Sequence, residues 1–185
     1  MLFRSEQVVA RAGHDVPLAG GRVVGDLDAL VRSWSPTDPH LHRLRIRLLD
    51  GERECDRLEH RVGFRHLAAE GTQVAWNGSP FVMRGVLHWG FSPPRLAPPV
   101  DPAWWRAQLV AFKALGFNTL KCCLWVPPRC VYEICDELGL VVWQEYPTWH
   151  PTMDQAHKQE LLTEYGEFFV HDRRHACVAF RSITC

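Results

Sequence analysis

The chain has 185 residues, of which 46% are hydrophobic and 23% are charged, and its 21 basic side chains are balanced by 21 acidic ones. This composition is typical of a globular protein, and the balanced charge gives no electrostatic reason to expect nucleic acid or an anionic membrane as a partner. The length suits one domain or parts of two, but a complete (β/α)8 barrel takes roughly 250 residues.

The first predicted element is a strand in which Leu44, Ile46 and Leu48 alternate with arginines. A period of two is typical of a half-buried strand, here with a basic outer face. The sequence Asp50-Gly51-Glu52 then predicts a hairpin turn, and a returning strand that runs up to Arg65 completes the pair.

The pattern of the sequence changes near residue 70, which indicates a domain boundary there. We therefore expect one domain over residues 1–70 and a second over 71–185. The second begins with a strand segment over 74–86 that contains a tight turn at 76–80. In chain order we then expect a helix over 102–115, a strand over 117–123, a helix over 129–138, a strand over 140–143, a helix over 154–169 and a strand over 177–183. Four strands interleaved with three helices indicate a parallel sheet and an α/β fold.

Polar and aromatic residues close these predicted strands, and in a βα barrel the reactive groups stand at the C-terminal ends of the strands. The candidate substrate-binding residues are therefore His88, Trp89, Lys121, Trp125, Glu145 and Trp149, with His150 beside the last of them. Each also has a structural interpretation: a hydrogen-bonded rim histidine, a Lys121–Glu145 pair in the barrel wall, and tryptophans that cover the core. Glycine-rich nucleotide-binding motifs and a Gly-x-Ser-x-Gly motif are absent from the sequence, and eight tryptophans suit stacking on sugars.

Seven cysteines, an odd number, lie mostly in apolar stretches. They favour reduced packing thiols over a disulfide framework, and no Cys-x-x-Cys or Cys/His spacing indicates a zinc site. We therefore expect no metal centre and no cofactor. Charged residues interrupt segment 1–17 and no apolar run reaches about 18 residues, so we expect a cytoplasmic location, although a signal could precede a fragment.

Short motifs follow one another along the chain in a fixed order. They are Trp34-Ser35-Pro36, Gly63-Phe64-Arg65, Trp76-Asn77-Gly78, Arg84-Gly85-Val86, Gly116-Phe117-Asn118, Cys135-Asp136, Val142-Trp143 with Glu145, and Asp172-Arg173-Arg174-His175. In order and spacing they resemble glycoside hydrolase family 2, the superfamily of β-galactosidases, β-glucuronidases and β-mannosidases. The resemblance implies the C-terminal part of an immunoglobulin-like β-sandwich over residues 1–70, followed by a partial (β/α)8 TIM barrel of about four strands over 71–185.

The resemblance also implies an activity for the parent enzyme, the hydrolysis of β-glycosides by a retaining double displacement that uses two carboxyl groups. In the family the acid/base glutamate follows the fourth strand, so it is expected just after Cys185, with the nucleophile further downstream. This chain would then hold neither catalytic glutamate and be inactive alone. The implied partners are a β-linked sugar or oligosaccharide and the missing half of the barrel; the oligomeric state is left open.

Three departures from the family pattern indicate a divergent member. Lys121 replaces an arginine, Leu124 replaces a histidine found in some members, and residues 181–185 differ from Trp-Ser-Leu-Gly-Asn. Two alternatives stay open. One is a non-catalytic carbohydrate-binding or assembly protein that reuses the half barrel, and the other is a different barrel glycosidase family, against which Gly63-Phe64-Arg65 argues. The sequence that follows Cys185 would distinguish the enzyme from the binding protein.

Overall fold

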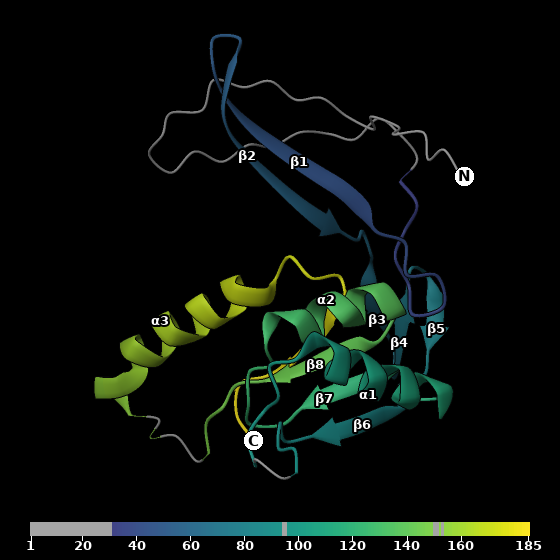
Figure 1. Ribbon diagram of the computed structural model, residues 1–185. Coiled ribbons are helices and arrows are strands. Elements are labelled where there is room, and N and C mark those ends of the chain that lie inside the picture. Colours follow the sequence, from purple (N-terminus) through teal and green to yellow (C-terminus); the bar gives the residue numbers. More distant parts are fainter. Residues whose placement is uncertain (1–30, 94–95, 150–151, 153) are drawn as a thin grey trace. The chain divides into compact units, whose positions relative to one another are not determined.

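A computed structural model describes residues 31–93, 96–149, 152 and 154–185, and we consider the compact unit over 33–185 by itself. Its elements are β1 (His42–Asp50), β2 (Arg53–Val62), β3 (Leu67–Glu70), β4 (Gln73–Trp76), β5 (Ser79–Phe81), β6 (Gly85–His88), α1 (Pro102–Ala114), β7 (Thr119–Cys122), α2 (Arg129–Leu138), β8 (Val141–Glu145), α3 (Gln155–Asp172) and β9 (Val178–Ser182) (Figure 1). None of the three helices found in the described residues is long and apolar enough to cross a membrane.

Strands β1 and β2 form the predicted antiparallel hairpin, with Asp50 paired to Arg53 across the turn. Gly51 has a φ of 59°, which explains why a glycine stands in this turn. The prediction that one face is buried is wrong for the described residues, because Ile46 and its apolar neighbours on that face are exposed. Alternation shows which side chains share a face, but burial requires a second layer, and the described elements supply none.

Strands β3, β4 and β5 form a small antiparallel sheet that packs on Trp34. The Trp34 ring is fully buried, and its Nε1 donates to the backbone oxygen of Asp136 in α2 at 2.7 Å. In return, Trp76 Nε1 and Asn77 Nδ2 donate to the backbone oxygen of Trp34 at 3.2 and 3.0 Å. Trp34 therefore ties the small sheet to the helical layer. The domain boundary expected at residue 70 falls at the end of β3 and stays a prediction.

The second half of the chain is a four-stranded parallel sheet in the order β6-β7-β8-β9, so the predicted α/β sheet with three helices is confirmed. Helices α1 and α2 lie against each other, and α2 also contacts β8 (Figure 1). The Asp101 cap accepts a hydrogen bond from Ala103 N at 2.9 Å, as its sequence position predicts.

Helix α3 runs to Asp172, three residues beyond the predicted end of the helix. The buried Asp172 carboxylate binds Arg181 of β9. This ion pair joins the last residue of α3 to the neighbouring strand β9, a contact that the helical periodicity of the sequence does not predict.

Gly139 ends α2 in the left-handed conformation, with a φ of 72°. A Cβ placed there would lie 2.5 Å from the backbone oxygen of Pro36, whereas a Cβ at Gly116, with a φ of 89°, would meet nothing within 4 Å. We expect Gly139→Ala to lower the free energy of unfolding by about 1–3 kcal/mol more than Gly116→Ala, because both variants carry backbone strain but only the first also collides with backbone. Denaturant titration of both variants tests this. Equal losses in the free energy of unfolding would show that the loop around Pro36 moves aside without a measurable cost.

Candidate functional site

The C-terminal ends of the four parallel strands meet at one edge of the sheet. The register pairs His88 with Cys122, Cys122 with Gln144, and Glu145 with Ser182. Residues far apart in the sequence therefore come together at this edge because all four strands run the same way.

Lys121 and Glu145 form an ion pair at this edge, with 3.0 Å between Lys121 Nζ and Glu145 Oε2. The Glu145 side chain is 1% exposed and that of Lys121 is 27% exposed. The ammonium also lies 5.0 Å from the centre of the Trp143 ring, within the range of a cation–π interaction. The structure thus brings together two of the residues predicted from the sequence.

The second oxygen of Glu145 accepts a hydrogen bond from the backbone N–H of Leu124 at 3.0 Å. Burial acts to raise the pKa of the Glu145 carboxyl, but hydrogen bonds from Lys121 and Cys123 outweigh it and hold this pKa below its usual value. Leu124 has a φ of 56°, which is strained for a branched side chain and turns its N–H toward the carboxylate. An ionised and oriented carboxylate results.

His88, predicted as a site residue, lies in an aromatic cluster. Its ring packs 5.2 Å from Trp105 and 5.6 Å from Trp125, measured between ring centroids. The Nδ1 atom accepts a hydrogen bond from Gly90 N at 2.8 Å, which places the proton of the neutral ring on Nε2. Burial lowers the pKa of His88, so the ring is held neutral.

The three predicted tryptophans occupy different environments. Trp125 is buried, stacks on Trp105 at 5.5 Å, and donates from Nε1 to the backbone oxygen of His88 at 2.7 Å. Trp89 and Trp149 are 43% and 61% exposed. Of the three, these last two therefore have most ring surface open to a ligand. His150 lies outside the described residues.

Gln144 and Cys123 also belong to this edge, although neither was predicted as a substrate-binding residue. The buried Gln144 side chain accepts from Tyr132 OH and donates to the Trp125 backbone oxygen, both at 2.8 Å. Cys123 is buried beside Glu145, and burial together with that carboxylate raises the pKa of its thiol to about 12. Buried amides and thiols inside apolar strands carry no distinctive sequence pattern, which is why they were missed.

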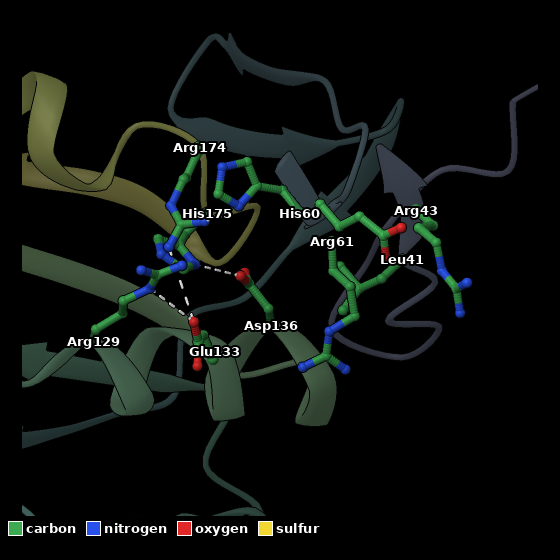
Figure 2. A pocket seen from close by; sticks show the side chains of 10 residues that line it. Leu41, Arg43, His60, Arg61, Arg129, Glu133, Asp136, Arg174 and His175 are labelled. Carbon is green, nitrogen blue, oxygen red and sulfur yellow. Dashed lines mark hydrogen bonds and ion pairs between the residues drawn. The ribbon is translucent and has the colours of Figure 1, made fainter. Parts of the chain in front are cut away.

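A separate cavity of about 390 Å³ lies where the hairpin meets α2 and the segment before β9 (Figure 2). It is lined by Leu41, Arg43, Glu59, His60, Arg61, Arg129, Glu133, Asp136, Arg174 and His175. Its charges pair with one another: Arg129 with Glu133 at 2.9 Å, and His175 with Asp136 at 2.6 Å. None of the predicted site residues lines it, so we assign this cavity to the attachment of the hairpin.

A parallel α/β sheet with an oriented carboxylate and aromatic side chains at its C-terminal edge is an arrangement found in barrel glycosidases. A profile of the family described as "Glycosyl hydrolases family 2" matches residues 5–65. The β-galactosidase of Aeromonas hydrophila is 34% identical over 118 residues, and that of Lactococcus lactis is 31% identical over 159 residues. These matches cover 63% and 81% of this chain.

The fold of this chain is similar to that in the crystal structure of Parabacteroides merdae β-glucuronidase, with a TM-score of 0.72 at 20% identity, over 83% of this chain and 19% of that one. The resemblance to glycoside hydrolase family 2 that was found in the sequence is therefore confirmed. It spans 11% and 16% of the length of the two β-galactosidases.

Proposed function

We propose that this chain forms part of the sugar-binding face of a retaining β-glycosidase. The observation that carries the proposal is the Lys121–Glu145 pair at the strand ends, in a chain whose relatives are β-galactosidases and β-glucuronidases. A buried, ionised carboxylate is suited to accept a hydrogen bond from a sugar hydroxyl, and the neighbouring ammonium keeps it ionised. Exposed rings at Trp89 and Trp149 are suited to stack on the sugar.

The finer architecture is part of the same proposal. Strands β6 to β9 with their helices would be the first half of a (β/α)8 barrel, and the β1–β2 hairpin would belong to an immunoglobulin-like sandwich. Four parallel strands with helical crossovers support the first assignment, and the alternating apolar face of β1 supports the second. In this arrangement both catalytic glutamates would lie outside the chain, and the reaction would use two carboxyl groups about 5 Å apart.

The test uses the longest open reading frame that contains these residues, incubated with nitrophenyl β-galactoside, β-glucuronide and β-mannoside. We expect turnover of at least one substrate, with the product formed first as the β-anomer when followed by NMR. An inverted product would contradict the retaining mechanism. Binding of sugars without any turnover would instead favour a non-catalytic carbohydrate-binding protein.

A further inference from the structure

Three side chains that bind metals in other proteins converge at the strand-end edge. Cys123 follows β7, Glu145 ends β8 and Cys185 follows β9. One ligand atom from each lies within 4.8 Å of the other two. Cys123 and Glu145 are buried, whereas Cys185 is exposed, so the cluster is walled by the protein on one side and open to solvent on the other.

The chemistry of the three donors is selective. Mg²⁺ and Ca²⁺ prefer cages made of oxygen ligands, whereas thiolates favour zinc and other soft ions. Zinc accepts cysteine sulfur and carboxylate oxygen together, and sites with three protein ligands keep a fourth position for water. Donors of a tetrahedral zinc site lie roughly 3.3–3.8 Å apart, given bonds of about 2.0–2.3 Å, so the cluster would tighten by about 1 Å. Cys185 lies outside strand β9, so its side chain can make this movement without disrupting the sheet.

The charges around the cluster also suit a divalent cation. Two thiolates and the carboxylate of Glu145 would carry three negative charges, against two from zinc and one from the Lys121 ammonium, so the assembly is neutral. Lys121 holds Oε2 of Glu145, and the Leu124 N–H holds Oε1, which orients the carboxylate before any ion arrives. Lys121 therefore acts as a partner of the charged cluster and does not exclude the metal.

We propose that Cys123, Glu145 and Cys185 bind a zinc ion at the C-terminal edge of the parallel sheet. As zinc binds, the protein ligands displace water from the ion and the two S–H bonds break, so that two zinc–sulfur bonds and one zinc–oxygen bond form and two protons pass to solvent. The site goes beyond the proposed glycosidase activity, because hydrolysis by two carboxyl groups needs no metal. Because thiol protons leave when zinc binds, zinc affinity should rise with pH.

The experiment uses the full-length protein, reduced with a phosphine and stripped of metal by a chelator. Zn²⁺ is titrated against a coloured chelator, and Co²⁺ is added to a second sample to record its absorption spectrum. We expect one zinc per chain and a sulfur-to-cobalt charge-transfer band. Cys185→Ser should weaken zinc binding by more than about 100-fold, because an exposed ligand is lost while the buried packing stays intact.

Cys55→Ser is the matched control, since Cys55 is an exposed thiol on β2. It should bind zinc as tightly as the parent protein. The proposal is overturned if stripped protein takes up no zinc, if Cys185→Ser binds as well as the parent, or if cobalt binds without a sulfur band. Zinc affinity is read without substrate, so inactivity toward glycosides leaves this result unaffected, and failure to bind zinc leaves the glycosidase proposal standing.

Discussion

Lys121→Met is expected to lower turnover of the enzyme that contains this segment by about 10²–10³-fold, the usual loss when an oriented charge is removed from a pocket poor in water. The Lys121 ammonium lies 3.0 Å from Glu145 Oε2 and, with Cys123, offsets the burial that would raise the pKa of this carboxyl. Without the ammonium, the folded-state pKa of Glu145 should rise. A neutral carboxyl would donate a proton where the pocket needs an acceptor.

Two further variants make the Lys121 result specific. Lys121→Arg should retain most turnover, because it keeps the charge and restores the residue that the family pattern has at this position. Arg106→Met is the matched control, since Arg106 is an exposed cation on α1 paired with Glu137, and it should leave turnover unchanged. Turnover per folded molecule and melting temperature are measured on one preparation. A Lys121→Met protein that melts earlier but works at full rate would assign the ion pair to the sheet wall alone.

Trp34→Ala is expected to lower the free energy of unfolding by about 3–5 kcal/mol, the usual cost of truncating a fully buried large aromatic side chain. The ring packs 5.5 Å from Trp76, and its Nε1 holds the backbone oxygen of Asp136. Trp34→Phe should lower the free energy of unfolding less. We expect a loss of about 1–3 kcal/mol in addition to any effect of repacking, because the buried backbone carbonyl of Asp136 loses its hydrogen-bond donor.

Denaturant titration followed by circular dichroism measures these losses on the full-length protein. Trp89→Ala is the control, since its ring is already 43% exposed and its truncation uncovers less apolar surface. If Trp34→Ala and Trp89→Ala were equally stable, Trp34 would not be the link between the small sheet and α2.

Local structure could be predicted from the sequence alone wherever the determining interactions are local. The hairpin turn at Gly51, the helix start at Asp101 and the helix end at Gly139 each depend on the conformation of a few neighbouring residues. The order of strands and helices followed from periodicity, and it was sufficient to predict a parallel sheet. The family could be recognised because its short motifs keep their order and spacing along the chain.

Which side chains are buried and which side chains pair with one another was decided only by the tertiary structure. From the sequence, Lys121 was equally a substrate-binding cation and a partner of Glu145, and the parallel register of β7 and β8 places them 3.0 Å apart. Which tryptophans keep an open face was likewise invisible, because Trp125 is buried by the ring of Trp105 from a distant helix.

The cysteines show this limit most clearly. Zinc motifs are recognised by short spacings, and the spacing between Cys123 and Cys185 is long, so no metal site could be predicted from the sequence. The ends of parallel strands meet at one edge however far apart they lie in the chain, and that geometry brings both thiols to Glu145. The local conformation of turns and helix ends depends on neighbouring residues. Contacts across a sheet depend on where the whole chain places its strands.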